Sequence, residues 1–409
     1  MQQLLHTPEG VKDYYNDECA AKRQLCARIR KVFELYGFEG IQTPTFEYFD
    51  IFNAERGSVA SKKMYKLFDR DGETLVLRPD FTPAIARCAA KYYPNETLPV
   101  RLCYEGNTFI NSVSYQGRLK EATQAGAELI GDDSLAADAE MLALVVDSLR
   151  SVGLTEFQVE VGQVDFFRGL LEEAELTPEQ IRELRDLIES KNHFGVEGML
   201  RSLSLPGELA GAFSSLPKLF GPAEQIFPAA RGLTGNATAL AAVDRLEQLY
   251  ELMKAYKMEK YISFDLGMLG NYEYYTGIIF EGYTYGTGDS IVTGGRYDHL
   301  MRQFGKDAPS IGFGIAVDTL MSAMQRQKLP IALPTGGILL LYDAPKRERA
   351  VSLASSFRDE GRRVRLMEKR HEDAEYVRCA KEHRIEQVLY LPESIAGIRT
   401  VWEASWEEE

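Results

Sequence analysis

Cysteine is scarce in this chain, and the cysteines that occur are not spaced as a structural set. The 409 residues contain no CxxC pair and only five cysteines: Cys19, Cys26, Cys88, Cys103 and Cys379. An odd, scattered set suits neither a disulfide framework nor a zinc site, so neither is expected to hold the fold together. We expect buried thiols in a reducing compartment.

Long apolar runs are also lacking. No stretch reaches membrane-spanning length, and the opening MQQLLHTPEG has no apolar core of the kind found in signal peptides. The sequence therefore predicts a cytoplasmic protein.

Positive charge is outnumbered. Lysine and arginine total 47 against 61 aspartate and glutamate residues, which gives a formal net charge of −14. Affinity for nucleic acids depends largely on basic side chains that neutralise phosphates. The composition therefore gives no indication of tRNA binding, although a local basic groove is compatible with an acidic total.

What is present is the composition of a folded globular protein, with 45% hydrophobic and 26% charged residues. Helical periodicity over 17–36 ends at Gly37, and a short strand is predicted over 40–44. Further strand patterns lie far apart in the chain, over 74–77, 100–104, 124–130, 157–161, 278–283 and 310–315. Hairpin-like neighbours dominate over βαβ units, so we predict an α+β fold with a mostly antiparallel sheet.

The rest of the chain divides into regions of different amino-acid composition. Residues 168–255 are rich in Leu, Glu and Ala and predict a helical insertion within a large domain over 1–325. Residues 326–336 contain Pro330 and all but the last residue of the run LPTGG, and we interpret them as a linker. Strand and helix patterns then alternate, which predicts a small α/β C-terminal domain over 337–409.

Two short segments place polar groups where a ligand could lie. In the strand pattern that ends at Gly131, Gln124, Gly126 and Glu128 share one face, and the glycine leaves room against the backbone. In LRPDFTP at 77–83, a turn could offer Asp80 and Thr82. A solvated strand face and a helix cap are the plainer alternatives for these segments.

Taken together, the segments resemble the catalytic core of histidyl-tRNA synthetase, a class II aminoacyl-tRNA synthetase, over roughly residues 5–325. The matching segments follow the family's order: YGFEGIQTP at 36–44 with Glu47, KMYKLFDR at 63–70, LRPD at 77–80, QAGAE at 124–128, EYYTG at 273–277 with Phe280 and Glu281, GGRYD at 294–298 and GFG at 312–314. The first of these resembles motif 1, which builds the family's dimer interface. The resemblance implies an antiparallel sheet core of the class II type.

The departures from that family concern arginines that hold ATP. Arginine suits phosphates because it forms bidentate, charge-assisted hydrogen bonds. The three family positions are occupied here by Ile110, Gly270 and Thr319, whereas Arg118 matches a retained arginine. The losses would abolish amino-acid adenylation, so we expect no catalysis and no cofactor.

The amino-acid pocket, by contrast, is retained by resemblance. Asp80 and Thr82 would hold the α-amino group of histidine, with Gln124 beside the main-chain groups. Glu128 and Tyr275 would bind the imidazole nitrogens, with Tyr274 next to them. An imidazole carries two ring nitrogens that both donate when it is protonated, and a carboxylate favours that form.

One synthetase-like family combines these features, the regulatory subunit of short-form ATP phosphoribosyltransferase. LRPDFTPAIAR at 77–87 and QAGAELIG at 124–131 resemble that family most. The resemblance implies a non-catalytic subunit that activates the catalytic ATP phosphoribosyltransferase and conveys feedback inhibition by L-histidine. It also implies a homodimer within a hetero-oligomer, with no tRNA, no membrane and no metal. An active histidyl-tRNA synthetase and a stand-alone amino-acid-binding module are the alternatives.

Overall fold

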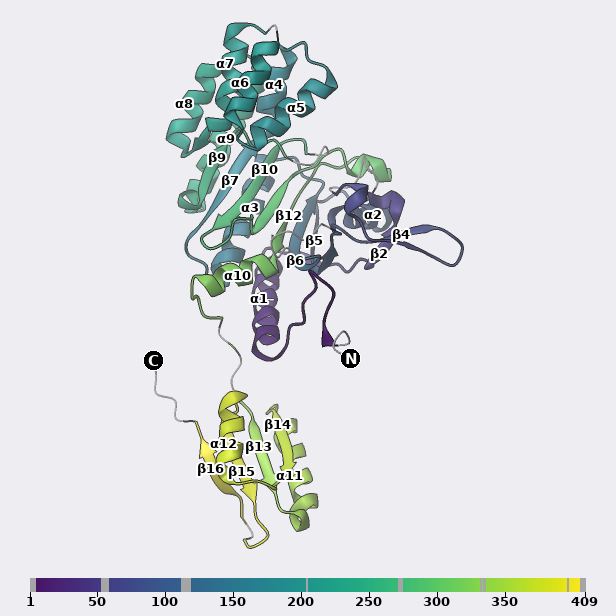
Figure 1. Ribbon diagram of the computed structural model, residues 1–409, viewed down its shortest axis with the longest axis vertical. Helices are drawn as coiled ribbons and strands as arrows, with labels where there is room; N and C mark the ends of the chain where they lie inside the picture. Colours follow the sequence, from purple (N-terminus) through teal and green to yellow (C-terminus); the bar gives the residue numbers. More distant parts are fainter. Residues whose placement is uncertain are drawn as a thin grey trace. The chain divides into compact units, whose positions relative to one another are not determined.

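A computed structural model describes residues 5–52, 59–111, 119–203, 205–270, 275–331, 333, 336–395 and 397–404 (Figure 1). The chain forms two compact units, Met1–Ile331 and Ala332–Glu409. The division falls within the segment 326–336. Each unit is described separately below.

The first unit is built on a large sheet with the strand order β1-β5-β6-β12-β11-β10-β7-β9-β8 in the described part of the chain. Neighbouring strands run antiparallel, except that β1 is parallel to β5 and β7 is parallel to β9. This confirms the predicted α+β class and its mostly antiparallel sheet. The strands are β1 (Glu39–Gly40), β5 (Val100–Phe109), β6 (Glu121–Ile130), β7 (Phe157–Gln163), β8 (Phe220–Gly221), β9 (Ile262–Asp265), β10 (Ile278–Thr284), β11 (Val292–Arg296) and β12 (Ser310–Ala316).

Near the site, one strand prediction is wrong in its extent and one strand was missed. The strand expected over 40–44 is wrong in extent, because β1 ends at Gly40 and only the Ile41 amide still donates to the Cys103 carbonyl, at 2.8 Å. Pro44 has no amide hydrogen and cannot continue such a ladder. Strand β11 was not predicted, because VTGGR has two glycines and little strand preference. It forms because β10 and β12 pair with it from both sides.

The two faces of this sheet have different roles. On β6, Ala125, Ala127 and Leu129 join the largest hydrophobic cluster, beneath helices α1 (Asn16–Leu35) and α3 (Leu135–Ser151). Side chains alternate along a strand, so Gln124 and Glu128 project to the opposite face. That face carries helix α2 (Thr82–Tyr92) and a smaller cluster that includes Phe81, Tyr104 and Tyr297.

A helical bundle follows β7, at the top of Figure 1, over the range for which the sequence predicts a helical insertion. Thr177 and Gln180 make a reciprocal capping box at the start of one of its helices. The helices that follow β7, together with α10 after β12, are α4 (Val164–Glu172), α5 (Pro178–Glu189), α6 (His193–Ser202), α7 (Gly207–Ser215), α8 (Ala223–Leu233), α9 (Ala237–Ala255) and α10 (Val317–Arg326).

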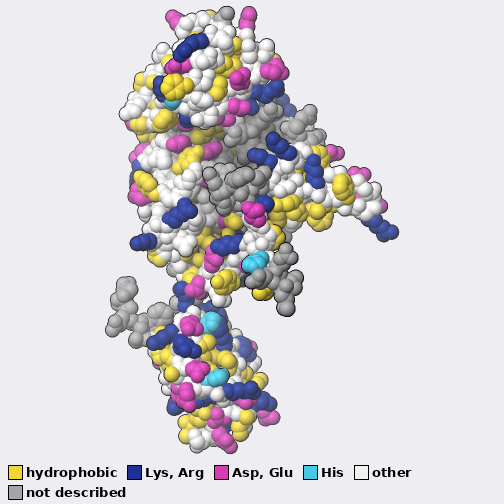
Figure 2. All heavy atoms as spheres, in the orientation of Figure 1, with side chains coloured by type: hydrophobic (Ala, Val, Ile, Leu, Met, Phe, Trp, Pro, Cys, Tyr) yellow, Lys and Arg dark blue, Asp and Glu magenta, His cyan; other side chains and the backbone are white. Residues whose placement is uncertain are grey.

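A second, three-stranded sheet precedes α2. It contains β2 (Phe46–Tyr48), β4 (Thr74–Leu77) and β3 (Lys66–Phe68), in that order across the sheet. Glu47 is buried and pairs with Arg87, whereas the aromatic residues on either side of it are exposed, Phe46 by 55% and Tyr48 by 57%. Hydrophobic side chains gather on this three-stranded sheet in Figure 2.

In the second unit, the described residues form a sheet with the strand order β14-β13-β15-β16. Alternate residues of β13 pack under α11 on one face and α12 on the other. The edge strand β16 was not predicted; it pairs antiparallel with β15. The elements are β13 (Ile338–Tyr342), α11 (Arg347–Asp359), β14 (Val364–Glu368), α12 (Asp373–Glu382), β15 (Gln387–Leu391) and β16 (Arg399–Glu403).

Three expectations from composition can be compared with this fold. Cys26, Cys88 and Cys103 are buried thiols as expected, whereas Cys19 and Cys379 are only half-buried. Among the described residues, no cluster of His, Cys, Asp and Glu could hold a metal ion. Within the same ranges, no helix has the length and apolar character needed to cross a membrane.

Candidate functional site

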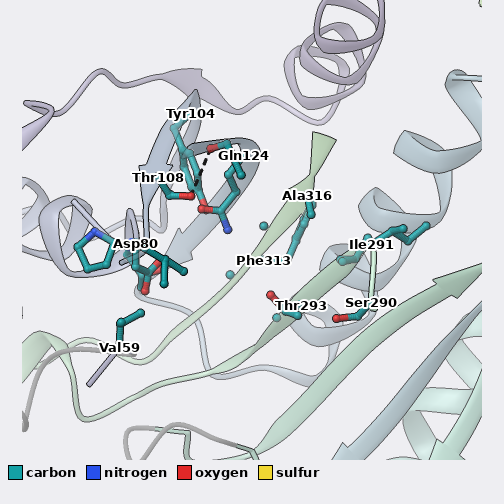
Figure 3. Close-up of a pocket in the computed structure, with 18 of the residues that line it drawn as sticks. Val59, Asp80, Tyr104, Thr108, Gln124, Ser290, Ile291, Thr293, Phe313 and Ala316 are labelled. Atoms are coloured by element: carbon teal, nitrogen blue, oxygen red, sulfur yellow. Dashed lines mark hydrogen bonds between the residues drawn. The ribbon is translucent and has the colours of Figure 1, made fainter. Parts of the chain in front are cut away.

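A cavity of about 190 Å³ lies over β6, β11 and β12 (Figure 3). Four residues singled out from the sequence line it: Asp80, Thr82, Gln124 and Tyr275. The cavity is smaller than the roughly 300–1,000 Å³ typical of pockets for drug-sized ligands, so it suits a small metabolite. Its other lining residues are Val59, Pro79, Tyr104, Thr108, Ile110, Ala122, Thr123, Ser290, Ile291, Val292, Thr293, Gly294, Tyr297, Gly312, Phe313, Gly314 and Ala316.

Two glycines of β12 make room for the long polar side chains of β6. Gly312 is paired with Glu128 across the two strands, and a Cβ at Gly312 would overlap the Glu128 carboxylate. A Cβ at Gly314 would overlap the amide of Gln124 in the same way. The side chains of β6 therefore lie across the backbone of β12, and this arrangement forms the floor of the cavity.

Glu128 is held at that floor by hydrogen bonds to both carboxylate oxygens. Thr82 Oγ1 donates to Oε1 at 2.8 Å, and the Tyr297 hydroxyl donates to Oε2. The Glu128 side chain is only 1% exposed. Its pKa is raised to about 8, chiefly by burial and also by the charge of Asp80, whereas the hydrogen bonds from Tyr297 and Thr82 act in the opposite direction.

This pKa predicts a pH-dependent contribution of Glu128 to stability. Between its ordinary value of 4.5 and about 8, the folded chain holds a proton that the unfolded chain has released. The free energy of unfolding should therefore fall as pH rises through this window, by up to about 1.4 kcal/mol per pH unit from this group. Glu128→Gln should remove that slope. Urea unfolding of both proteins across the window would measure it, and parallel pH profiles would contradict the prediction.

Asp80 lies two residues before the start of helix α2 at Thr82. Its Oδ1 accepts a hydrogen bond from the Phe81 amide at 2.7 Å, at the helix end where a negative charge is favoured. Thr82, the first residue of α2, donates its hydroxyl hydrogen to Glu128. The Thr82 oxygen can still accept, so Asp80 and Thr82 together present acceptors to a ligand ammonium group.

Two tyrosines of the site were not picked out from the sequence. Tyr104 stacks on Phe81 with 4.3 Å between ring centroids, and a Cβ at Gly126 would overlap its hydroxyl. Burial raises the pKa of both Tyr104 and Tyr297, so their hydroxyls remain neutral donors. The signals were available: Gly126 is paired with Tyr104 across the strands, and Tyr297 lies within GGRYD. Neither pattern by itself tells which side of the sheet the ring occupies.

The three positions that lack the synthetase arginines have different surroundings. Ile110 lines the cavity directly. Gly270 has a left-handed backbone with φ of 83°, and a Cβ there would lie 3.0 Å from the Tyr275 ring. Thr319 is in α10, after Asp318, whose carboxylate accepts from the Thr123 amide at 2.6 Å. Two further sequence predictions, Tyr274 and Arg118, lie outside the described residues.

Comparisons with known proteins agree with this architecture. The histidyl-tRNA synthetase sequence family matches residues 10–320. The chain is 38% identical over 362 residues to the ATP phosphoribosyltransferase regulatory subunit of Acetivibrio thermocellus, covering 88% of this chain and 86% of the relative. It is 37% identical to the protein of the same name from Thermoanaerobacter pseudethanolicus, covering 95% of this chain and all of that one.

Solved structures give the same picture. A Bacillus halodurans protein described as an ATP phosphoribosyltransferase regulatory subunit/histidyl-tRNA synthetase superposes with a TM-score of 0.85 and 30% identity, over 96% of this chain and 99% of that one. Histidyl-tRNA synthetase from Nostoc sp. shares the fold, with a TM-score of 0.80 and 20% identity over 95% of this chain and 92% of its own.

Proposed function

Because this chain belongs to the family of ATP phosphoribosyltransferase regulatory subunits, which have the histidyl-tRNA synthetase fold, we propose that it binds free L-histidine in the cavity above β6 and β12. The chain has a regulatory role in histidine biosynthesis and is not itself the catalytic enzyme. Its partner is a catalytic ATP phosphoribosyltransferase. Histidine binding would convey feedback inhibition to that partner.

The proposal is supported by a contrast around one cavity, between the positions that would bind the amino acid and those that would bind ATP. Two acidic residues belong to the amino-acid side, Asp80 at the lining and the buried Glu128 at the floor, and in the proposed pose they would lie near the amine and the imidazole of histidine. Where an ATP phosphate would need an arginine, the wall has the apolar Ile110. Such a cavity supports amino-acid binding without adenylation.

The arrangement around Glu128 supports an imidazole site in particular. Thr82 and Tyr297 hold the carboxyl group of Glu128 in place before any ligand enters, so little ordering is needed on binding. An imidazolium next to Glu128 would favour the ionised carboxylate and offset the cost of its burial. Gln124 and Tyr275 supply further polar contacts, and Tyr274 remains part of the proposed set.

We further propose that the chain forms homodimers within a hetero-oligomer and does not bind tRNA. The exposed Phe46 and Tyr48 on β2 flank Glu47, the last residue of the segment that resembles motif 1, and exposed aromatic side chains of this kind support an interface. In the second unit, acidic and basic side chains are interspersed in Figure 2, and many form ion pairs, such as Arg399 with Asp373 at 2.5 Å. Mixing of this kind does not favour a phosphate backbone.

Reconstitution with a short-form catalytic ATP phosphoribosyltransferase tests the proposal. We expect the chain to activate phosphoribosyl transfer and histidine to inhibit the activated complex. Glu128→Ala should keep the activation, while about 10- to 100-fold more histidine should be needed for inhibition, the effect of losing one hydrogen bond to a charged group.

Glu121→Ala is the matched control, because Glu121 is on the same strand but bonds to Asn107 instead of the cavity residues. It should leave histidine sensitivity unchanged. A wild-type complex indifferent to histidine would refute the sensing role, and a fully sensitive Glu128→Ala complex would show that the ligand binds elsewhere.

A further inference from the structure

Two tyrosines line the cavity from segments that lie just outside neighbouring strands. Tyr275 precedes β10, and Tyr297 directly follows β11. The two strands pair antiparallel, and towards the tyrosines their ladder ends at the pair of Ile279 and Gly295. The positions of both rings therefore depend on contacts made beyond this ladder.

Beyond the ladder, Thr276 and Asp298 join the two segments through their side chains. The Thr276 hydroxyl donates to Oδ2 of Asp298 at 2.9 Å, and its oxygen accepts from the Asp298 amide at 3.0 Å. The Thr276 amide also donates to the Arg296 carbonyl at 2.8 Å. Each member of the pair is adjacent in sequence to one of the tyrosines, so the pair holds the two tyrosine-bearing segments together.

The other carboxylate oxygen of Asp298 is fixed by two further donors. Oδ1 accepts from the Ser310 amide, at the start of β12, at 3.0 Å and from the Arg296 guanidinium at 3.2 Å. Arg296 is buried and is held in turn by Asp138 of α3. Asp298 is thereby attached to the interior of the sheet, and Thr276 is attached through it.

Both tyrosine rings have little freedom of position. A Cβ at Gly295 would lie 2.7 Å from the ring of Tyr275. The Tyr297 ring is buried, and its hydroxyl donates to Oε2 of Glu128. A hydrogen bond weakens steeply when its length or angle leaves the preferred range, so a small shift of Tyr297 would weaken this contact.

We propose that Thr276 and Asp298 are positioning residues of the effector site, which hold the Tyr297 hydroxyl in line with Glu128. This inference rests on the proposed function of the same cavity. Neither Thr276 nor Asp298 is among the described residues that line the cavity, so both would act through Tyr297 and not on the ligand itself. Loss of the contact between them should therefore weaken histidine binding.

The variant Thr276→Val keeps the shape of the side chain and removes its hydroxyl. In calorimetric titration of the full chain, we expect it to weaken histidine binding about tenfold. Thr276→Ser keeps the hydroxyl and should bind histidine within about twofold of the wild-type affinity. Thr284→Val is the matched control and should leave the affinity unchanged, because Thr284 is the last residue of β10 and its hydroxyl donates to the Glu156 carbonyl at 2.6 Å.

A double-mutant cycle separates positioning from a general loss of stability. Tyr297→Phe already lacks the hydroxyl, so adding Thr276→Val to it should weaken histidine binding by less than about twofold. Equal losses in both backgrounds would overturn the inference, because Thr276 would then not act through Tyr297. Unchanged affinity in a folded Thr276→Val protein would overturn it as well. If Thr276→Val does not fold, Asp298→Ala takes its place in the same cycle with the same expectations.

These outcomes leave histidine sensing itself intact, because the wild-type chain still binds histidine in each of them. Absence of histidine binding to the wild-type protein, both alone and in its complex, would instead refute the proposed function. The two failures are therefore distinguishable.

Discussion

Gly312→Ala should weaken histidine binding by about 10- to 100-fold, an effect as large as the loss of one hydrogen bond to a charged group. The added methyl would overlap Oε2 of Glu128. Strand β12 cannot retreat from it, because Ile311 and Phe313 on its other face are buried in the main hydrophobic cluster. Glu128 must therefore turn away and give up its bonds from Thr82 and Tyr297.

Titration calorimetry with histidine measures this effect, and thermal unfolding checks that the fold persists. Gly198→Ala is the control, because Gly198 is in α6 and no atom lies within 4 Å of the added Cβ. Gly314→Ala is a second site variant; it should weaken binding through Gln124 instead of Glu128. Wild-type affinity in a folded Gly312→Ala protein would remove Glu128 from the proposed contacts.

Asp138→Ala should lower the free energy of unfolding by about 3–5 kcal/mol, the cost of leaving a buried charge without its partner. Asp138 on α3 is fully buried and accepts hydrogen bonds from Arg296 of β11 at 2.5 and 3.0 Å. The other carboxylate oxygen of Asp138 accepts two hydrogen bonds from Arg245 of α9, also at 2.5 and 3.0 Å. The truncation would leave Arg296, itself 3% exposed, without this carboxylate.

Urea unfolding provides the measurement. Glu179→Ala is the matched control: it breaks an exposed 3.1 Å pair with Arg182, and we expect a change within about 0.5 kcal/mol. Replacing both buried partners, as in Asp138→Leu with Arg296→Met, should recover part of the loss, because the buried guanidinium is removed and only the more exposed Arg245 and Asp298 lose a partner. A loss below about 1 kcal/mol in Asp138→Ala would show that water or other groups satisfy Arg296.

Many of the strands could be predicted from the sequence, because they carry continuous apolar patterns bounded by turns. The strand expected over 74–77 has the same limits as β4, and those over 100–104 and 124–130 lie within longer strands. Prediction failed for β11 and β16, where pairing with neighbours decides the conformation. Local preference carries no information about a neighbour that is distant in the chain.

In the candidate site, contacts between side chains that are distant in the chain could not be predicted either. The alternation of β6 was enough to place Gln124 and Glu128 on one face. It could not show that Thr82 is bonded to Glu128, since these residues are 46 positions apart and meet only when α2 packs on the sheet. It also gave no role to Tyr297, whose position depends on the chain that follows β11.

The floor of the cavity restricts how its ligand preference can change over evolutionary time. Each long side chain on β6 occupies space that a glycine on β12 leaves open, so the two strands must vary together. A bulkier residue in place of a β12 glycine is tolerated only after the facing side chain on β6 has been shortened. Shortening the β6 side chain alone leaves a void. Single-step mutational paths away from the present pair therefore pass through impaired intermediates. We expect drift in effector choice to proceed through the lining residues that surround this floor, such as Ile110, and not through the floor itself.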